Sequence, residues 1–260
     1  MSGRPQQKIK IEWLSSFAYG VGLMTSDGNL NSDGRHLSFK SAENELIEKF
    51  KTSFKLTNKI TRSARGGEPE KRYLNVFFGD VVFYRFLNSI GITKAKSKTI
   101  KAVTIPDLHF ADFLRGLFDG DGTFYTSWDK RWPSSFVFQI AFASASLEFI
   151  RWLKARLTHL YGVKGIICKG AGVFNLRYVK GDTRKLYAVM YHHENLLYLT
   201  RKYRKIRDAF QKDDALKLTH ARNRELRWGS SVVEHSPEER SVAGPIPAPS
   251  IKSQDFAAMV

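Results

Sequence analysis

The sequence has one cysteine, no apolar run of membrane-spanning length and few acidic side chains. Cys168 stands alone in 260 residues, which excludes an internal disulfide framework and fits a reducing compartment. No stretch approaches the roughly 20 apolar residues that a membrane helix needs, so no membrane partner is expected. The first ten residues are basic and lack the hydrophobic segment of a secretory signal. We therefore expect an intracellular protein, in the cytoplasm or nucleoid of a prokaryote or in an organelle.

The shortage of acidic residues leaves a large positive charge. The chain carries 42 Lys and Arg against 25 Asp and Glu, a formal net charge of +17. A field of this size favours a polyanionic partner such as nucleic acid, bound in a salt-sensitive way. A generally basic protein without such a partner would show the same composition, so function has to be argued from motifs.

Two segments of the chain repeat one pattern. Residues 20–28 (Gly-Val-Gly-Leu-Met-Thr-Ser-Asp-Gly) and 114–122 (Leu-Arg-Gly-Leu-Phe-Asp-Gly-Asp-Gly) are apolar, contain glycine and end in Asp-Gly. An isolated Asp-Gly after an apolar run is usually a turn. Two copies with their aspartates 94 residues apart, at positions 27 and 121, indicate instead an internal duplication.

The glycines inside both copies predict closely packed helices. Gly20 and Gly22 in the first copy, and Gly116 and Gly120 in the second, carry no side chain. Two helices could therefore approach until their backbones nearly touch. A glycine costs a helix about 1 kcal/mol relative to alanine, so its repeated use implies a packing reason. The glycine after each final aspartate then ends the helix.

Asp27 and Asp121, which end the two copies, are candidate metal ligands. An aspartate at a helix C-terminus faces the negative end of the helix dipole, which is unfavourable unless a cation lies nearby. Brought together by the helix pair, the two carboxylates would suit Mg²⁺, or another divalent cation such as Mn²⁺ or Ca²⁺ in its place. Both aspartates are therefore predicted to be metal-binding.

The sequence around each copy is duplicated as well. Each motif is followed by a strand-like segment (37–42 and 140–145), an amphipathic stretch, a further strand-like segment (74–80 and 175–182) and a helix-like segment. Each half therefore predicts helix, two strands, helix, two strands, helix. The expected fold class is α+β, with two halves of the same architecture.

The domain limits follow from this duplication. We expect an N-terminal half at residues 10–105 and a C-terminal half at residues 106–215. Residues 216–260 do not belong to either repeat; Pro, Ser and Ala cluster near their end and no helical or strand period is visible. These residues are predicted to be a disordered tail.

Strand periodicity predicts which side chains face away from the core. Leu37 and Phe39 alternate with polar residues, and Gln139 alternates with Phe138 and Ile140. Arginine can pair with guanine, and asparagine or glutamine with adenine, so outward polar residues are candidates for reading a DNA groove. Each is equally compatible with a solvated strand position. The candidates are His36, Ser38, Arg62, Arg65, Arg72, Asn75, Gln139, Lys169, Asn175 and Arg177.

The second motif closely resembles the signature of the LAGLIDADG homing endonucleases, of the type with two motifs in one chain. The resemblance extends over roughly residues 10–210, although the first motif has Thr25 where the signature has its earlier acidic residue. Membership implies a pseudo-twofold αββαββα duplication that acts as a monomer. Two antiparallel sheets would form a saddle over double-stranded DNA, with the two motif helices at the centre.

The resemblance implies that the metal ions held by Asp27 and Asp121 activate water for attack on a phosphodiester, which makes both aspartates catalytic. It also implies further catalytic residues. It predicts a basic residue in each half beyond the last strand, a place that Lys96 and Lys202 match. It predicts a polar residue that orders water at the strand end after each motif; Lys40 fits, whereas its counterpart is Ala143. The implied activity is metal-dependent hydrolysis of both strands of a long, non-palindromic duplex, and the alanine would favour nicking or a slow second cut.

Three functions stay open at this stage. The leading one is a site-specific metal-dependent endodeoxyribonuclease, free-standing or intron-encoded. The second is an RNA maturase that uses the same basic saddle to bind intron RNA without cleaving it. The third is a DNA-binding regulator on a cleavage-deficient scaffold. Retention of both Asp27 and Asp121 favours the first, because binding alone does not require them.

Overall fold

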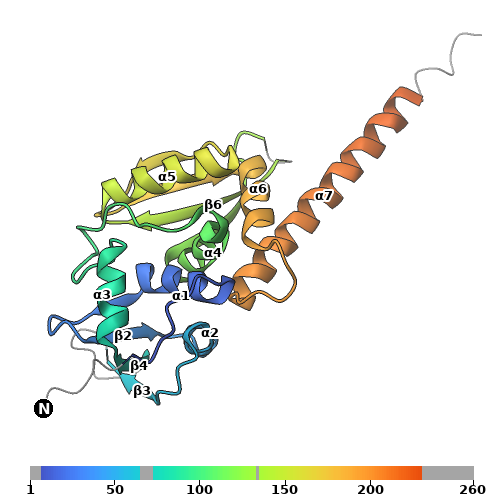
Figure 1. The fold of residues 1–260 in the computed structure, drawn as a ribbon. Helices are drawn as coiled ribbons and strands as arrows, with labels where there is room; N and C mark the ends of the chain where they lie inside the picture. Colours follow the sequence, from blue (N-terminus) through green and yellow to red (C-terminus); the bar gives the residue numbers. More distant parts are fainter. Residues whose placement is uncertain (1–6, 65–72, 133–134, 230–260) are drawn as a thin grey trace, which may run out of the picture. The chain divides into compact units, whose positions relative to one another are not determined.

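The computed structural model describes residues 7–64, 73–132 and 135–229 (Figure 1). These residues form two four-stranded antiparallel sheets and seven α-helices. Within the described residues, no helix is both long enough and apolar enough to cross a bilayer. The chain divides into one compact unit that ends at Asp214 and a second that begins at Ala215. Both halves of the duplication lie in the first unit.

The first half follows the predicted order of elements. Motif helix α1 (Ser15–Ser26) leads into β1 (Gly28–Leu30), β2 (His36–Ser41), α2 (Asn44–Phe54), β3 (Ile60–Ser63), β4 (Tyr73–Gly79) and α3 (Val81–Ser89). The strands lie in the order β1-β2-β4-β3, and each neighbouring pair is antiparallel.

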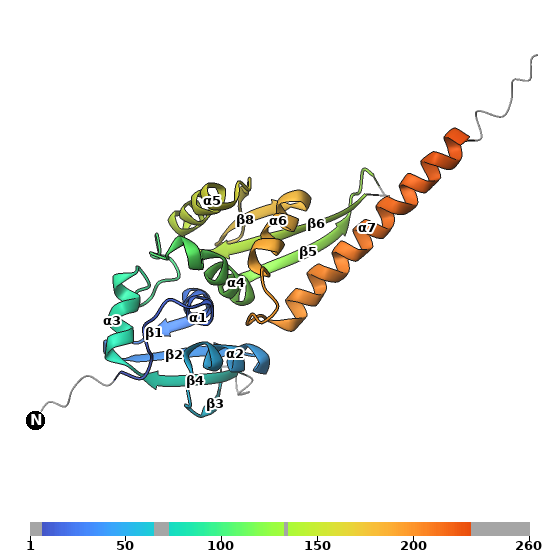
Figure 2. The same cartoon turned by 45° about the vertical axis from the view of Figure 1, so that its right-hand side comes forward.

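The second half repeats this arrangement. A short 3-10 turn, Asp107–His109, precedes α4 (Phe110–Asp121), β5 (Gly122–Trp128), β6 (Phe136–Ser144), α5 (Leu147–Tyr161), β7 (Ile166–Lys169), β8 (Phe174–Val179) and α6 (Lys180–Met190). The strand order β5-β6-β8-β7 matches that of the first sheet (Figure 2). The predicted α+β class and the duplicated αββαββα architecture are confirmed.

Helices α1 and α4 cross in backbone contact at two glycines. A Cβ atom on Gly22 would lie 2.2 Å from the carbonyl oxygen of Phe113, and one on Gly116 would lie 2.0 Å from that of Tyr19. Real Cβ atoms do not approach backbone oxygens this closely, so only glycine allows the crossing. The helix pair that carries the two motifs is therefore specified by the motifs themselves.

The other two motif glycines have different neighbours. A Cβ on Gly120 would lie 2.6 Å from the Oδ2 atom of Asp27, so this glycine also serves the helix pair. Gly20 does not: a Cβ there would meet Ser53 and Phe54 of α2. The expectation that all four glycines lie between the motif helices is thus corrected for Gly20, which instead seats α2 against α1.

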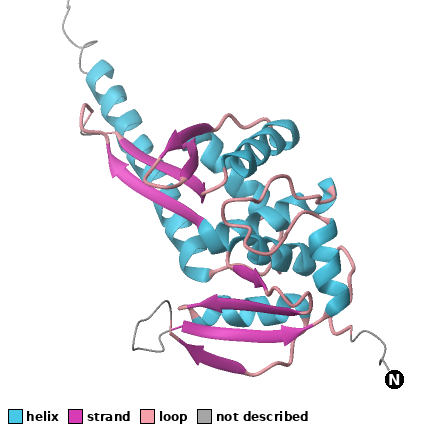
Figure 3. Ribbon diagram, turned by 90° about the vertical axis from the view of Figure 1, so that its left-hand side faces the viewer, coloured by secondary structure: helices cyan, strands magenta, loops and turns pink. Residues whose placement is uncertain are grey.

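Each sheet buries one face. Leu37 and Phe39 of β2 are fully buried, as are Phe138 and Ile140 of β6, in the predicted phase. Helix α2 packs on the first sheet, and α5 and α6 pack on the second, so the opposite face of each sheet is left open by these helices. Figure 3 shows the two groups of strands in magenta. One-sided sheets of this kind expose alternate side chains to a partner.

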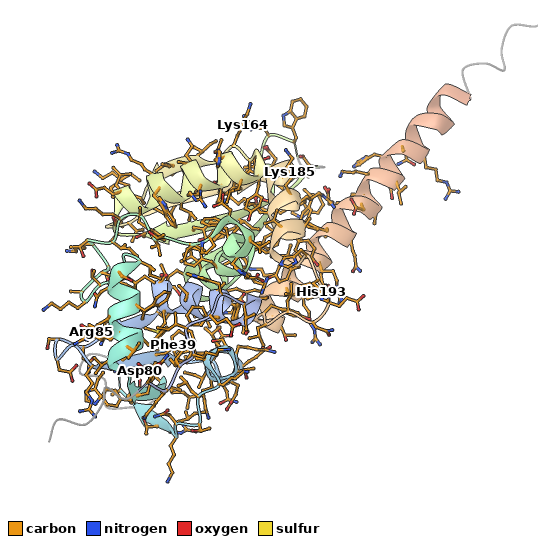
Figure 4. The ribbon with its side chains drawn as sticks, viewed as in Figure 1. Phe39, Asp80, Arg85, Lys164, Lys185 and His193 are labelled. Atoms are coloured by element: carbon orange, nitrogen blue, oxygen red, sulfur yellow. The ribbon has the colours of Figure 1, made fainter. Side chains whose placement is uncertain are left out.

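The strand–helix junction of the first half is fixed by Asp80, labelled in Figure 4. Its fully buried carboxylate accepts a hydrogen bond from the backbone N–H of Phe83 (2.8 Å) and so caps α3. The same side chain accepts from the backbone N–H groups of Lys8 (2.7 Å) and Ile9 (2.9 Å), which ties the N-terminal segment to the sheet.

Helix α7 (Thr200–Gly229) departs from the prediction of a tail that begins at residue 216. Between Ala215 and Trp228 the sequence has neither glycine nor proline and is rich in good helix formers, so it continues the helix. The remaining part of the predicted tail, 230–260, lies outside the described residues.

Candidate active site

Helices α1 and α4 bring Asp27 and Asp121 to one place. Asp27 is the C-cap of α1 and Asp121 is the last residue of α4. The contact of Asp27 with Gly120 shows that the first carboxylate lies against the end of the second helix. Both aspartate side chains are exposed, so a ligand can reach them. The duplication therefore produces a pair of accessible carboxylates where the two motif helices end.

The pKa values of both aspartates are raised. Partial removal from solvent raises the pKa of Asp27 to about 6, and the charge of Asp121 acts in the same direction. Loss of solvent also raises the pKa of Asp121. An anionic pair with raised pKa values gains from a bound cation, which stabilises the ionised form of both groups.

The donor set fits a divalent cation that shares its ligands with a substrate. Within the described residues, no group of three or more His, Cys, Asp and Glu could hold a metal ion. Asp27 and Asp121 alone leave most coordination positions of Mg²⁺ to water and phosphate oxygens, as is common for this ion. Bound there, the ion would lower the pKa of a coordinated water and neutralise charge on a phosphate.

Lys202 lies under the end of α4. From the first turn of α7, its ammonium group donates to the carbonyl oxygens of Phe118 (2.6 Å), Asp119 (2.8 Å), Gly120 (3.1 Å) and Gly122 (2.7 Å). The side chain is only 7 % exposed. Burial lowers its pKa to about 8. A cation at this place offsets the negative end of the helix dipole and the carboxylate beside it.

Lys96 takes the corresponding place at the end of α1. It lies in the loop after α3, is 9 % exposed, and donates to the carbonyl oxygen of Gly28. Burial lowers its pKa to about 8, while the charges of Asp121 and Asp27 act in the opposite direction. Each motif helix thus ends on a buried lysine, which supplies the cation that an aspartate at a helix C-terminus requires.

A cavity opens beside each aspartate. One of about 350 Å³ is lined by Asp27 and by Lys40, which lies exposed near the end of β2. The other, of about 330 Å³, is lined by Asp121, Lys202 and Lys205. The sequence pattern does not single out Lys205, although its helical spacing of three residues from Lys202 puts both on one side of α7.

Six of the predicted DNA-binding residues lie on the open sheet faces. Residues paired across antiparallel strands share a face, and the register places them opposite the buried phase. Asn75 is opposite Lys40, and Arg177 is opposite Ala141. The six are His36, Ser38, Asn75, Gln139, Asn175 and Arg177. A partner lying on these faces would meet their side chains.

Two of the open-face residues on β2 have restricted side chains. His36 is hydrogen-bonded through Nδ1 to the carboxylate of Asp33 and stacks on the exposed ring of Phe77 at 5.0 Å between centroids. Ser38 shares this face but is only 6 % exposed. Its hydroxyl group is therefore less available to a partner than the alternation of the strand suggests.

Arg62 and Lys169, two further candidates, do not share the open faces. Arg62 pairs with Leu74 and Lys169 pairs with Phe174, residues in phase with the core. Both side chains are exposed because β3 and β7 are short edge strands at the rim of their sheets. Arg65 and Arg72 lie outside the described residues.

The comparisons with known proteins agree with the duplicated fold. Residues 110–206 match the family described as the LAGLIDADG-like domain. No curated protein matches the chain in sequence. The LAGLIDADG meganuclease I-AabMI, solved bound to uncleaved DNA, is similar with a TM-score of 0.55 at 12 % identity, over 78 % of this chain and 92 % of that one.

Two homing endonucleases solved with their DNA targets show the same likeness. I-LtrWI gives a TM-score of 0.53 at 11 % identity over 78 % of this chain and 91 % of its own. I-GzeII gives 0.52 at 13 % identity over 82 % and 92 %. At these identities the likeness is one of fold, and it spans both halves.

Proposed function

Because this chain has the duplicated LAGLIDADG fold, with a LAGLIDADG-like domain at residues 110–206, we propose that it is a site-specific, metal-dependent DNA endonuclease. The observation that carries the proposal is the pair of accessible carboxylates, Asp27 and Asp121, each beside a buried lysine. Two carboxylates that repel each other and a DNA phosphate would weaken simple binding, so their presence together fits hydrolysis better.

In this proposal the chain's own residues divide the work. Asp27 and Asp121 would hold Mg²⁺, or Mn²⁺ or Ca²⁺ in its place, between the protein and the scissile phosphates. Lys96 and Lys202, protonated at neutral pH, would stabilise the charge that develops on the phosphate. Lys40 lines the first cavity and would orient the attacking water there.

The open sheet faces would read the sequence of the DNA. Arg177 and the amides of Gln139 and Asn175 have the donor and acceptor patterns that distinguish base pairs in the major groove. The longest strand has 7 residues in the first sheet (β4) and 9 in the second (β6). At about 3.3 Å per residue these strands span about 23 and 30 Å, so the two sheets would cover on the order of 16 base pairs. Since the two halves differ in sequence, the site should not be a palindrome, and one chain should act as a monomer.

The relatives with solved structures support duplex DNA as the partner, because I-AabMI, I-LtrWI and I-GzeII are all described as bound to DNA. The net charge of +17 has the sign that this partner requires. Such an enzyme could be encoded within a mobile intron or by a free-standing gene.

The decisive experiment is incubation with a randomised duplex library and Mg²⁺, followed by sequencing of the cut ends. We expect cuts confined to one long site, and no cuts when the metal is chelated. The Asp27→Asn, Asp121→Asn double variant is the matched control, since it keeps the fold and the basic surface. Tight binding of duplex without any cutting would support a DNA-binding regulator, and preference for structured intron RNA would support a maturase.

A further inference from the structure

Arg115, the second residue of the second motif, is completely buried in the motif helix pair. Its guanidinium group donates to the carbonyl oxygens of Met190 and Leu197 and to the carboxylate of Asp112, each at 2.7 Å. A buried charge is stable only when it is paired and hydrogen-bonded in this way. The equivalent position of the first motif is Val21, which can form none of these bonds.

The groups held by Arg115 lie at the two ends of one linker. Met190 is the last residue of α6, and Leu197 lies three residues before α7 begins. The same Asp112 accepts from the hydroxyl of Ser15 on α1 (2.7 Å), and its carboxylate lies 3.4 Å from Nε2 of His192 in the linker. The segment between α6 and α7 is therefore attached to the motif helices by buried, charge-assisted bonds.

A second attachment comes from Asp119, the earlier acidic residue of the motif. Its Oδ2 atom accepts from the backbone N–H of Leu199 (2.7 Å) and from the hydroxyl of Tyr19 (2.8 Å), and the residue is 1 % exposed. The carbonyl of Leu199 in turn accepts from the backbone N–H groups of Lys202 and Tyr203 as α7 starts. The hydrogen bond from Leu199 to Asp119 thus fixes the position at which α7 starts.

From this geometry we propose that Arg115 and Asp119 are positioning residues that hold Lys202 under the end of α4. Lys202 lies three residues beyond Leu199, and its four carbonyl acceptors lie between 2.6 and 3.1 Å away. A movement of the first turn of α7 by about one ångström would break several of these bonds at once. A role of Lys202 in cleavage rests on the proposed function, whereas the position of Lys202 under the end of α4 does not.

Among the residues that the structure describes, the first half shows no counterpart of this network. Thr25 occupies the position of Asp119 and donates to the carbonyl oxygen of Val21 within its own helix (2.8 Å). Lys96 reaches one carbonyl, that of Gly28, from a loop. The network therefore acts on one lysine and not on the other, which gives every test of it an internal reference.

The outer side of the same turn is held by weaker attachments. Thr200 donates through its backbone N–H to Glu45 (3.1 Å), and Arg201 donates to Glu43 (2.7 Å). The Arg201 pair is largely exposed, and such pairs contribute little once salt screens them. The buried bonds of Arg115 and Asp119 are consequently the ones expected to decide where Lys202 lies.

The test labels the native full-length protein with an amine-acylating reagent, without DNA or metal, and follows each lysine by peptide mass spectrometry. In Arg115→Met we expect Lys202 to be acylated at least about tenfold faster than in the wild type, because local opening exposes its amine. Lys96 should keep its wild-type rate. The matched control is Arg156→Met, which removes an arginine of the same half that pairs with Asp107.

Arg115→Lys tests whether the hydrogen-bonding geometry matters beyond the charge. A lysine keeps the charge but cannot bond three separate acceptors in the fork arrangement of a guanidinium, so labelling of Lys202 should rise by an intermediate factor. If Arg115→Met does not fold, which would expose both lysines, the comparison of Lys202 with Lys96 in Arg115→Lys decides. Wild-type labelling of Lys202 in a folded Arg115 variant would overturn the proposal.

Measuring the cleavage of each DNA strand separately distinguishes a positioning role from a general structural one, because a general structural defect would not affect one strand selectively. We expect the folded Arg115 variants to lose cutting of one strand of the target selectively, with unchanged affinity for the duplex. A uniform loss on both strands would count against the positioning role. If instead the wild type cuts no duplex, the proposed function fails while the labelling result stands, because labelling requires neither DNA nor metal.

Discussion

Lys40 and Ala143 occupy equivalent positions in the two sheets. Lys40 lies opposite Asn75 across β2 and β4, and Ala143 lies opposite Asn175 across β6 and β8. Lys40 is exposed and lines the cavity beside Asp27. The two halves of a duplicated protein therefore differ at the same strand position, where one offers a cation and the other a methyl group.

This difference predicts unequal cutting of the two DNA strands. A lysine at the strand end can order water or stabilise charge, and an alanine can do neither, so a nicked intermediate should accumulate on a supercoiled plasmid that carries the site. Lys40→Ala should slow cleavage of the faster-cut strand and so reduce the difference between the two rates. Ala143→Lys should speed cleavage of the slower-cut strand. Simultaneous cutting of both strands, unchanged in Lys40→Ala, would show that this position has no catalytic part.

Removal of either central carboxylate should abolish cleavage and spare binding. Charge stabilisation by a bound metal is worth several kcal/mol, so Asp27→Asn or Asp121→Asn should slow cleavage at least about a thousandfold. Affinity for the duplex should stay the same or increase, because a negative charge near phosphate is lost. Asp208→Asn, a surface change on α7, is the control. Efficient cleavage by either variant would remove that aspartate from the site.

The rate of cleavage should show a bell-shaped dependence on pH. Asp27 must be ionised to bind a cation, and its pKa is raised to about 6, so activity should fall as the pH drops below that value. Lys96 and Lys202 must be protonated, and their pKa values are lowered to about 8, so activity should also fall above that value.

Metal concentration separates the two limbs of this profile. A bound cation favours the ionised carboxylate, so more Mg²⁺ should shift the acid limb to lower pH and leave the alkaline limb in place. Affinity for DNA measured over the same pH range controls for changes in binding. An acid limb that does not respond to metal would show that Asp27 is not a ligand.

The repeat, the helix crossing and the two aspartates were predictable because each leaves a periodic or duplicated signal in the sequence. Two glycines inside each motif predict close packing of the motif helices, and three of these four glycines indeed lie where α1 and α4 cross. The different neighbour of Gly20 could not be predicted from the sequence. A glycine in a helix indicates that another segment packs closely against it, but it does not indicate which helix that segment belongs to.

Other features leave no local signal. Strands β3 and β7 have four residues each, too few for alternation to fix their phase, so the sequence does not show which face Arg62 and Lys169 occupy. Arg115 reads as a surface residue from its charge; its burial depends on carbonyl groups more than 70 residues away. Long-range partners of this kind are a product of the fold and cannot be read from spacing.

The corrected faces of the sheets predict different roles for two exposed arginines. Arg177 lies on the open face of the second sheet, where a bidentate contact to a guanine is worth about 1–3 kcal/mol of discrimination. Arg177→Ala should therefore relax specificity at one or two base pairs. Arg62→Ala should at most weaken binding equally for all sequences and reduce its salt dependence by about one contact. A panel of single-base target variants measures both, and loss of specificity in Arg62→Ala would contradict the register.

The crossing of α1 and α4 makes Gly116 the position where one methyl group should cost most. In Gly116→Ala the new Cβ would lie 2.0 Å from the carbonyl oxygen of Tyr19, and since a backbone atom cannot move alone, the helices must separate. Overpacking of this kind costs about 1–3 kcal/mol or more, which exceeds the roughly 1 kcal/mol that alanine gains in helix propensity. Separation would also pull Asp27 away from Asp121, so cleavage should fall along with stability.

Gly181→Ala is the matched control: no atom lies within 4 Å of its added Cβ, so it should be neutral or slightly stabilising. Chemical denaturation of the three proteins measures the difference, and a Gly116→Ala variant as stable as Gly181→Ala would mean that the two motif helices do not touch.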